Sequence, residues 1–448
     1  MVDIEFGTGA VKVTPAHDFN DEETGKKHKL EQIVVIGFDG KMQPTAGKYA
    51  GSTIAEARKA VLEDLGTLDL LEKEEDYKNR VGVCYRCRTV IEPLPLEQFF
   101  IKVAPLAKPA LEAVKKGRIK IYPKNYTKTY TYWMENIKDW NISRQIVWGI
   151  KIPAWYCVGC GKTTVTEGEK PKICGDCGVD QFDEETDTFD TWFSSGQWPY
   201  VTLQTSKPGD FDKFYPTNVM ETGYDILFKW VARMIMFGLY QTGKVPFKDV
   251  ALHGLVNDPL GQKMSKSKGN VVSPIELISQ YGADSIRIAL VYGTAFGHDQ
   301  SLSYPKFQAM RNFTNKLWNI GRFILMYYQN SEVSASPVDF VPNKVTYEDD
   351  KAIVEKLEKT ITIVTKSLDT YRFHDGAEAL YEFIWHEFAD KYVESTKSRR
   401  AEAQPVLEYV FRTSLELLHP FMPFITEELW QKLPHEGKSI MLAKWPNT

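Results

Sequence analysis

Three lysines set among small residues mark the stretch GQKMSKSKGN, residues 261–270, as a candidate binding loop. Lys263, Lys266 and Lys268 lie within six consecutive positions. The stretch follows a largely apolar run at 250–256, typical of a buried parallel strand, and precedes a helix predicted to begin after Ser273. Ligands of open α/β sheets bind beyond the carboxyl ends of strands, and helix N-termini favour phosphate. The pattern indicates an anion site, with a solvated lysine-rich turn as the alternative.

The cysteines form a second constellation that could do chemistry. All six occur as C-x-x-C pairs: Cys84/Cys87, Cys157/Cys160 and Cys174/Cys177. The second and third pairs are separated by thirteen residues, and together they offer the four soft ligands that a structural zinc ion takes. The first pair is half a site. It is either a pair of reduced cysteines or part of a second zinc site completed by other residue types.

The elements expected around the lysine loop have an α/β pattern between 222 and 305. The stretch 222–240 is apolar almost all round and predicts one helix, and 249–256 predicts a buried strand. Ser273, Pro274 and Glu276 predict a helix N-terminus with a capping box. These elements would place the loop at the end of a parallel sheet.

The two ends of the chain differ in predicted secondary structure. Residues 1–51 predict a β-rich module of strands and tight turns, with a turn at Asp39-Gly40, followed by a helix over 53–65 capped by Thr53. After 306 the chain reads as helical, with a Pro/Ser linker at 334–344. Two apolar stripes at helical spacing support this: Met310, Phe313, Leu317, Ile320 and Ile324, and Ala377, Leu380, Ile384 and Phe388.

Bulk properties exclude several classes of protein. The 448 residues are 43% apolar and 25% charged, which argues against disorder, and their number predicts several domains. No run has the length of a membrane span and the N-terminus has no secretion pattern, so the expectation is a cytoplasmic protein without a membrane partner. With a net charge of −4, nucleic-acid contacts would need local basic patches such as 115–128.

Longer motifs connect these features to one family. KMSKS has the form of the second nucleotide-binding motif of class I aminoacyl-tRNA synthetases. Six longer stretches resemble those of valyl-tRNA synthetases in residue sequence and in order along the chain. They are HGLVNDPLGQKMSKSKGN, FGTGAVKVTPAHDFND, NISRQIVWGIKIPAWYC, DTFDTWFSSGQWP, TGYDILFKWVARMIM and LLHPFMPFITEELW. The resemblance implies a multidomain α/β plus all-α fold. It comprises a β-rich partial editing domain (1–80), the second half of a class I Rossmann-like nucleotide fold with a zinc-knuckle insertion at about 155–180 (81–305), and a helical anticodon-binding domain (306–448).

The resemblance implies an activity and roles for the loop. The family forms valyl-adenylate from valine and ATP with Mg²⁺ and transfers valine to tRNA(Val). Lys263 and Lys266 would be catalytic, stabilising charge on the departing pyrophosphate. The implied ATP-binding residues are His253, Gly254, Lys263, Met264, Ser265, Lys266 and Ser267. A histidine in a buried strand and a glycine needed for packing are the alternatives for the first two.

Two further sites follow from the resemblance. Trp192, Asp225 and Ile226 match the amino-acid pocket, although Asp225 could instead complement a helix dipole. A valine pocket rejects the isosteric threonine weakly, so the family hydrolyses mischarged tRNA at a second site. The residues that match this editing site are Lys12, Thr14, Asp18 and Asp21. Asp18 could instead cap a helix that starts near Phe19.

One motif of the family is absent from the sequence. None of the eight histidines belongs to an H-x-G-H motif. We therefore expect that the N-terminal catalytic half and the C-terminal arm of the family lie outside this chain, and that the chain alone cannot activate valine. The chain would then be either a fragment of a longer enzyme or one half of a split enzyme that a separate polypeptide carrying H-x-G-H completes. The alternative is a non-catalytic tRNA-binding fragment.

Overall fold

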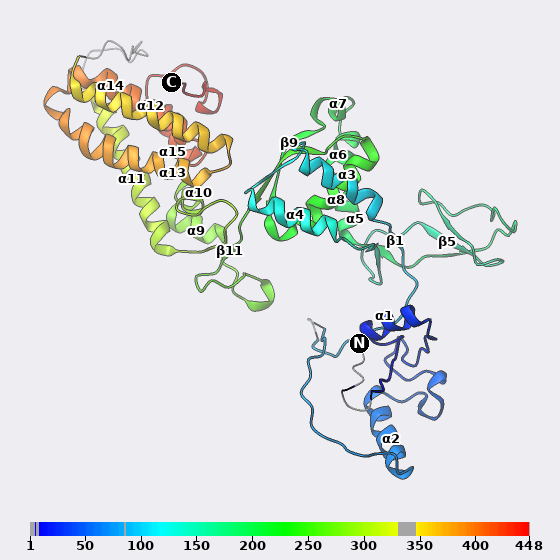
Figure 1. The fold of residues 1–448 in the computed structure, drawn as a ribbon. Coiled ribbons are helices and arrows are strands. Elements are labelled where there is room, and N and C mark those ends of the chain that lie inside the picture. The colour runs from blue at the N-terminus through cyan, green and yellow to red at the C-terminus, as the bar shows by residue number, and fades with distance from the viewer. Residues whose placement is uncertain (1–4, 6–8, 85–86, 330–345, 448) are drawn as a thin grey trace. The chain divides into compact units, whose positions relative to one another are not determined.

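The structure, a computed structural model, describes residues 5, 9–84, 87–329 and 346–447 (Figure 1). It divides the chain into the units Met1–Phe99 and Phe100–Thr448, which are considered separately below. The first unit contains the helices α1 (Phe19–His28) and α2 (Ile54–Thr67) and the 3₁₀ helix η1 (Pro44–Tyr49).

Side-chain caps start both helices of the first unit. Asp18 accepts hydrogen bonds from the backbone N–H groups of Asn20 and Asp21, which confirms the helix predicted near Phe19. Thr53 and Glu56 form a reciprocal capping box at the start of α2, as the sequence predicts for Thr53.

The prediction of a β-rich module in the first unit is wrong for the described residues. They contain isolated bridges, such as Ile36 with Met42, in place of strands. The predicted turn at Asp39-Gly40 is present, with Gly40 at a φ of 75° and the N–H of Gly37 bonded to the carbonyl of Lys41. The backbone N–H of Val35 donates to the ring of His17 rather than to a neighbouring strand, so no ladder extends from the turn.

A three-stranded parallel sheet lies in the first part of the second unit. Its order is β2 (Lys120–Tyr122), β10 (Phe247–His253) and β9 (Thr217–Gly223). Val250 on β10 pairs with Ile121 and Met220, and all three side chains are buried. The predicted buried strand is therefore confirmed in the form of β10, which is continued after a break by β11 (Val256–Asn257).

Helices and short strands surround this sheet. The helices are α3 (Ala104–Lys115), α4 (Asn125–Glu135), α5 (Thr191–Ser195), α6 (Trp198–Thr205), α7 (Asp210–Phe214) and α8 (Ala232–Thr242). The short strands are β1 (Phe100–Ile101), β3 (Trp140–Asn141), β4 (Ser143–Arg144), β8 (Thr188–Phe189) and β12 (Gln300–Ser301). A separate antiparallel sheet has the order β6 (Thr163–Val165), β5 (Ala154–Cys157) and β7 (Phe182–Glu184).

Two predicted helices differ from the structure. The helix expected over 222–240 begins only at Ala232. Thr222 and Gly223 pair with β10, and a 3₁₀ turn (η2, Tyr224–Ile226) and a π turn (η3, Leu227–Val231) follow. Pairing with the sheet outweighs the helical pattern of these first residues.

The helix predicted after Ser273 is divided in two. Gly282 adopts φ 87° and ψ 147°, a conformation open mainly to glycine, and it separates α9 (Pro274–Tyr281) from α10 (Ala283–Val291). Ser273 precedes α9 as predicted, but its side chain makes no capping hydrogen bond. The predicted capping box is therefore wrong. Pro274, whose φ is fixed near the helical value, occupies the first position of the helix.

The rest of the second unit is helical, as predicted. It comprises α11 (Tyr304–Gln329), α12 (Glu348–Asp369), α13 (Phe373–Glu382), the π-helical η6 (Phe383–Val393), η7 (Lys397–Arg399), α14 (Arg400–Leu418), α15 (Pro423–Trp430) and η8 (Ile440–Leu442), which gather into one bundle (Figure 1). Both predicted apolar stripes are buried in its core. The predicted linker at 334–344 lies outside the described residues. None of the described helices combines the length and apolar character needed to cross a membrane.

Candidate functional site

The lysine loop follows the carboxyl end of the parallel sheet. β10 ends at His253, β11 pairs with β12, and Asn257 forms a bridge with Lys263 inside the loop. A 3₁₀ turn, η4 (Lys266–Lys268), occupies the middle of the loop, and α9 begins four residues after Asn270. The structure thus places the lysines at the edge of the sheet where ligands of α/β folds bind.

Two polar residues outside the predicted set hold the loop. Asp258 is 5% exposed and accepts hydrogen bonds from the backbone N–H groups of Gln262 (2.7 Å) and Leu260 (3.0 Å). Asn270 donates to the Asp258 carboxylate at 2.9 Å and accepts from the N–H of Ser265 at 2.9 Å. The available sequence signal was Asp258-Pro259, which predicts a turn without indicating that its side chain reaches the far end of the loop.

The loop and the candidate amino-acid site meet at one ion pair. Lys263 Nζ lies 3.1 Å from the carboxylate oxygen Oδ2 of Asp225, which comes from the 3₁₀ turn after β9. Lys266 is exposed, and Met264 packs against the core of the helical bundle. The side chain of Ser267 is outside what the structure describes. One of the two candidate catalytic lysines is therefore joined to a residue predicted for another substrate.

His253 and Gly254 form a tight corner beside the loop. His253 Nδ1–H donates to the carbonyl of Gly254 at 2.7 Å, and its Nε2 lies 3.4 Å from Glu221. A Cβ on Gly254 would lie 1.9 Å from the carbonyl oxygen of His298. This close approach to backbone atoms supports the packing alternative for Gly254. A cavity of about 220 Å³ opens beside both residues.

Trp192 is held by a buried carboxylate at the start of α5. Asp190 accepts from the backbone N–H of Trp192 at 3.2 Å and also binds the indole N–H of Trp140 (2.9 Å) and the guanidinium of Arg144 (2.8 Å). At the other end of α5, the indole N–H of Trp230 donates to the carbonyl of Ser195 at 2.9 Å. These bonds bring α5 against η3, which directly follows Ile226.

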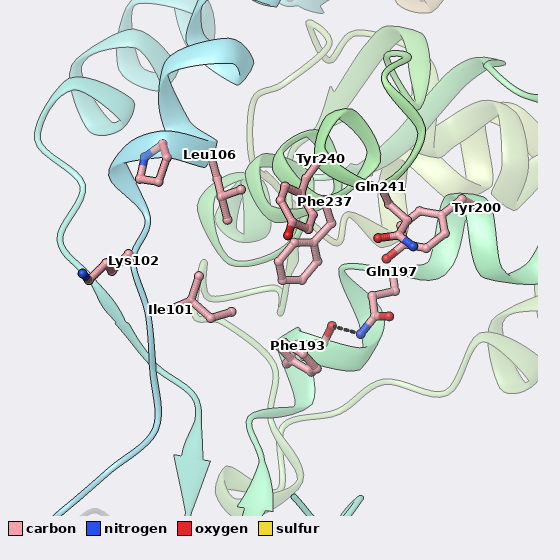
Figure 2. Close-up of a pocket in the computed structure, with 10 residues that line it drawn as sticks. Ile101, Lys102, Leu106, Phe193, Gln197, Tyr200, Phe237, Tyr240 and Gln241 are labelled. Carbon is pink, nitrogen blue, oxygen red and sulfur yellow. Dashed lines mark hydrogen bonds between the residues drawn. The ribbon is translucent and has the colours of Figure 1, made fainter. Parts of the chain in front are cut away.

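An apolar cavity beside α5 contains none of the predicted site residues. Its volume is about 440 Å³, and Figure 2 shows Phe193 of α5 and Gln197, which precedes α6, facing Phe237 and Tyr240 of α8 across it. The Gln197 side chain donates to the carbonyl of Phe193 at 3.2 Å. Ile101 and Leu106 complete the apolar wall, and Lys102 is the one charged residue of the described lining, so this cavity offers mainly shape and apolar area.

The predicted editing residues come together only in part. Lys12 Nζ donates to the Thr14 hydroxyl at 3.2 Å, and Asp21 accepts from the Thr14 N–H at 2.7 Å and from its hydroxyl at 3.0 Å. The backbone hydrogen bond from Thr14 is the main cause that lowers the pKa of Asp21. Asp18 instead caps α1, so the alternative considered for this residue describes its position in the structure.

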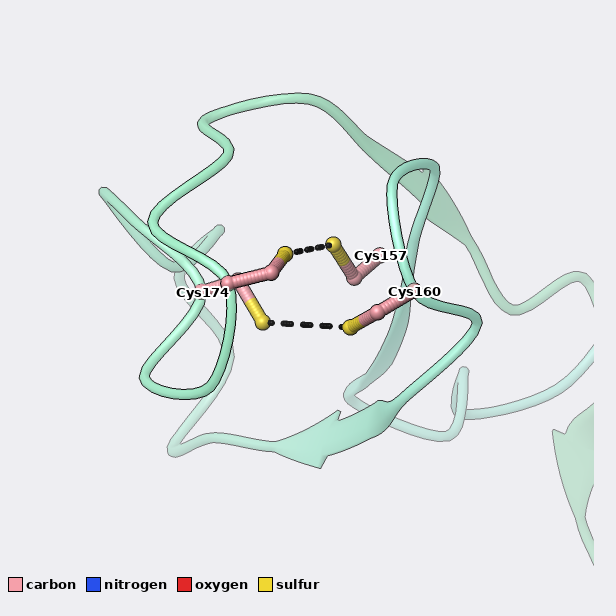
Figure 3. A group of neighbouring side chains, drawn as sticks. Cys157, Cys160 and Cys174 are labelled. Carbon is pink, nitrogen blue, oxygen red and sulfur yellow. Dashed lines mark hydrogen bonds between the residues drawn. The ribbon is translucent and has the colours of Figure 1, made fainter.

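Four cysteines converge in the small antiparallel sheet (Figure 3). The Sγ atoms of Cys157, Cys160, Cys174 and Cys177 all lie within 4.8 Å of one another, with distances of 3.4 Å for 157–177 and 3.7 Å for 160–174. Four sulfurs at ~2.3 Å from a tetrahedral zinc ion would be about 3.8 Å apart. The arrangement fits one zinc ion.

The remaining cysteine pair is different. Cys87 is exposed, and its thiol donates to the Thr89 hydroxyl at 3.2 Å. Hydrogen bonds from the side chain and backbone of Thr89 lower the pKa of Cys87 to about 7. Among the described residues, Cys84 and Cys87 belong to no group of three or more potential metal ligands. The second zinc site considered from the sequence therefore gains no support.

Comparisons with known proteins agree over nearly the whole chain. Residues 17–303 match the model of class I tRNA synthetases (I, L, M and V), and residues 350–448 match the anticodon-binding domain of tRNA ligases. The chain is 50% identical to the valine–tRNA ligase of Carboxydothermus hydrogenoformans, covering 99% of the chain and 51% of that protein. The Geobacter sulfurreducens valine–tRNA ligase is 47% identical, with 100% and 51% covered. The chain thus spans about half the length of these curated relatives.

Solved structures of similar fold are more distant in sequence. A Mycobacterium tuberculosis methionyl-tRNA synthetase with methionyl-adenylate has a TM-score of 0.60 at 19% identity, covering 78% of this chain and 65% of that one. An Agrobacterium radiobacter LeuRS in a ternary complex with tRNA and LeuAMS has a TM-score of 0.58 at 24% identity, covering 69% and 43%. At these identities the likeness shows the fold.

Proposed function

The chain belongs to the class I tRNA synthetases of the I, L, M and V group, and from this we propose that it forms part of a valine–tRNA ligase. Its reaction joins valine to ATP and then to tRNA(Val). The observation that carries the proposal is the lysine loop beyond β10, with Lys263 in contact with Asp225. The valine–tRNA ligases at 47–50% identity support valine as the amino acid.

The proposed first step is adenylate formation. The valine carboxylate oxygen attacks the α-phosphorus of ATP, the bond from that phosphorus to the bridging oxygen breaks, and pyrophosphate leaves. Lys263 and Lys266 would stabilise the charge that develops on the pyrophosphate. Mg²⁺ on the phosphates would supply further neutralisation. His253, Gly254 and the backbone of the loop would line the ATP site.

The proposed amino-acid site comprises Asp225, Ile226 and Trp192. The carboxylate of Asp225, 3.1 Å from an ammonium group in this structure, has the position and charge to hold the α-ammonium of valine. Ile226 and Trp192 would supply the apolar wall for the two methyl groups. The hydrogen bond from Trp230 to Ser195 joins α5 to η3, the π turn that directly follows Ile226, and this supports the grouping.

The proposed editing and anticodon-binding regions lie at the two ends of the chain. Lys12, Thr14 and Asp21 form the hydrogen-bonded group that could receive a mischarged threonine, while Asp18 contributes through the position of α1. We assign 1–80 to partial editing, 81–305 to the nucleotide fold and 306–448 to anticodon binding. The match of 350–448 to an anticodon-binding domain supports the last assignment, and with it tRNA as a partner.

The four-cysteine cluster is proposed to bind structural zinc. Thiolates are the ligands zinc prefers, and backbone N–H groups of Asp176 and Cys177 lower the pKa of Cys174 to about 6, which favours its ligating form. Metal analysis of the purified chain should give one zinc per chain, reduced to a small fraction in a Cys174→Ser variant.

Valine-dependent exchange of pyrophosphate into ATP tests the proposed enzyme function. The chain alone is expected to be inactive. Addition of a polypeptide that carries the H-x-G-H half, produced from the portion of the C. hydrogenoformans ligase outside the match, should restore exchange, and Lys263→Met should abolish it. The second candidate is a tRNA-binding fragment without activity, favoured by the anticodon-domain match. Binding of tRNA with no exchange in the mixture would decide for that candidate.

A further inference from the structure

The lysine loop combines like charges with a flexible backbone, and neither feature fixes the positions of its ammonium groups. Three ammonium groups within six residues repel one another, and the glycines Gly261 and Gly269, both at positive φ, give the backbone freedom. A site for a polyphosphate requires those charges at fixed positions before the ligand arrives, because order imposed on binding reduces affinity. Something outside the lysines must therefore hold the loop.

Asp258 holds the entry to the loop. Its Oδ1 accepts from the N–H groups of Leu260 and Gln262, and its own N–H donates to the carbonyl of Gln262 at 2.9 Å. The residue next to Gln262 is Lys263, whose backbone is thus fixed from one side. A buried carboxylate used in this way is costly to leave without its donors, so the arrangement is strongly specified.

Asn270 holds the C-terminal end of the loop. Together with Asp258 it forms a hydrogen-bonded pair, called the clamp below. Its amide donates to Asp258 Oδ2 at 2.9 Å and to the carbonyl of Lys263 at 3.3 Å, and its Oδ1 accepts from the N–H of Ser265 at 2.9 Å. The carbonyl of Lys263 and the N–H of Ser265 flank Met264, which packs on the core. The segment that carries the first catalytic candidate is therefore bonded from both ends of the loop.

We propose that Asp258 and Asn270 are positioning residues that set the lysine loop for a polyphosphate ligand. The proposal rests on the proposed function for the nature of that ligand, while the clamp itself rests on the hydrogen bonds above. Neither side chain is expected to touch the phosphates. Each acts through the backbone of Lys263 and its neighbours.

An exchange of the two residues gives a matched test. In Asp258→Asn, two amide groups face each other, and in Asn270→Asp two carboxylates do, so each single variant breaks the clamp. The double variant Asp258→Asn/Asn270→Asp again offers oxygens to Gln262, Leu260 and Ser265 and an N–H···O bond between the two side chains. The one hydrogen bond that the double variant cannot restore is the bond from the side-chain amide of residue 270 to the carbonyl of Lys263.

Tryptic cleavage after the loop lysines reports on the clamp without any ligand. Peptides cut after Lys263, Lys266 and Lys268 are quantified by mass spectrometry, with cleavage after exposed Lys172 as the internal control. Hydrogen bonds to charged groups are among the stronger ones in proteins, so each single variant should raise loop cleavage at least about tenfold. The double variant should return to within about threefold of the original chain. Equal cleavage in all four proteins would overturn the clamp.

Binding of inorganic tripolyphosphate at low salt tests the positioning role. Calorimetry should show about tenfold weaker binding in each single variant and recovery in the double variant. In a Lys263→Met background, Asp258→Asn should cost clearly less affinity than the tenfold expected in the original chain, because the charge nearest the clamp is gone and only Lys266 and Lys268 remain to be positioned. A purely structural role would give the same loss in both backgrounds and would overturn the proposal. In a further outcome, the original chain shows the expected cleavage pattern but binds no tripolyphosphate. That result would overturn both the proposed anion-binding role of the loop and the positioning role of Asp258 and Asn270. The hydrogen-bonded clamp itself would still be supported by the cleavage data.

Discussion

At the scale of single residues, the main finding is that two candidate ligand-binding side chains bind each other. Lys263 was predicted for ATP and Asp225 for the amino acid, yet their charged atoms are 3.1 Å apart. The Lys263 side chain is 66% exposed and that of Asp225 35%, so the pair is screened by solvent and its stability is modest. Under the proposed function, a substrate ammonium group would replace Lys263 at Asp225, and a phosphate would replace Asp225 at Lys263.

The replacement of Asp225 should make the loop a better anion site when no amino acid is present. In Asp225→Asn, Lys263 loses its competing carboxylate, and an exposed pair is worth about 0.2–1 kcal/mol. Tripolyphosphate should therefore bind up to about fivefold more tightly at 50 mM salt, measured by calorimetry, with the gain lost near 1 M salt because of screening. Glu221→Gln, which removes the carboxylate beside His253, is the control and should leave affinity within about twofold. Weaker binding in Asp225→Asn at low salt would contradict the idea.

Gly254 gives a residue-scale prediction about packing. In Gly254→Ala the new Cβ would meet the carbonyl oxygen and carbon of His298 at 1.9 and 2.1 Å, and both atoms are backbone. The chain must move to accept it, at a cost of about 1–3 kcal/mol or more in the free energy of unfolding. Denaturant unfolding should show this loss in the second unit. Gly66→Ala is the matched control, since no atom lies within 4 Å of its Cβ site in helix α2, and it should be neutral or slightly stabilising.

At the scale of elements, local patterns predicted what local forces decide. The buried strand β10, the cap at Thr53 and the apolar stripes of α11 and α13 were readable because their signals lie within one element. The helix over 222–240 was not, because its first residues pair with a strand that lies far along the chain. The link between Asp258 and Asn270 joins the two ends of a twelve-residue gap, and the sequence has no signal for such a bond.

The cysteine cluster leads to a prediction for one element. The antiparallel sheet β6-β5-β7 has a small core in which Cys157, Cys174 and Phe182 are the buried residues. We expect so small a core to depend on the zinc ion proposed above. Removal of zinc with a chelator should raise hydrogen exchange across 154–184 by at least about tenfold and leave the helices α12 and α14 unchanged. Unchanged exchange in this sheet after complete removal of zinc would show that the metal does not hold it.

At the scale of the whole molecule, the two units differ greatly in buried apolar surface. Among the described residues of the first unit, the buried apolar side chains are Ala16, Ile36 and Ala57, while Phe19, Phe38 and Tyr77 are more than three-quarters exposed. The second unit has a continuous core that runs from Leu277 on α9 to Ile440 on η8. Burial of apolar area is the dominant stabilising term of folding, so the units should differ in stability.

Hydrogen exchange of the intact chain should reveal this difference. Capping hydrogen bonds start α1 and α2, but caps contribute only about 1 kcal/mol each and cannot replace a core. Amides of α2 should therefore exchange at least about a hundredfold faster than those of α14, because local opening needs far less free energy than opening of a large core. Guanidinium unfolding followed at the same amides should give an earlier transition for α2. Equal protection of α2 and α14 would contradict this expectation and would mean that the first unit draws its stability from something other than its own buried side chains.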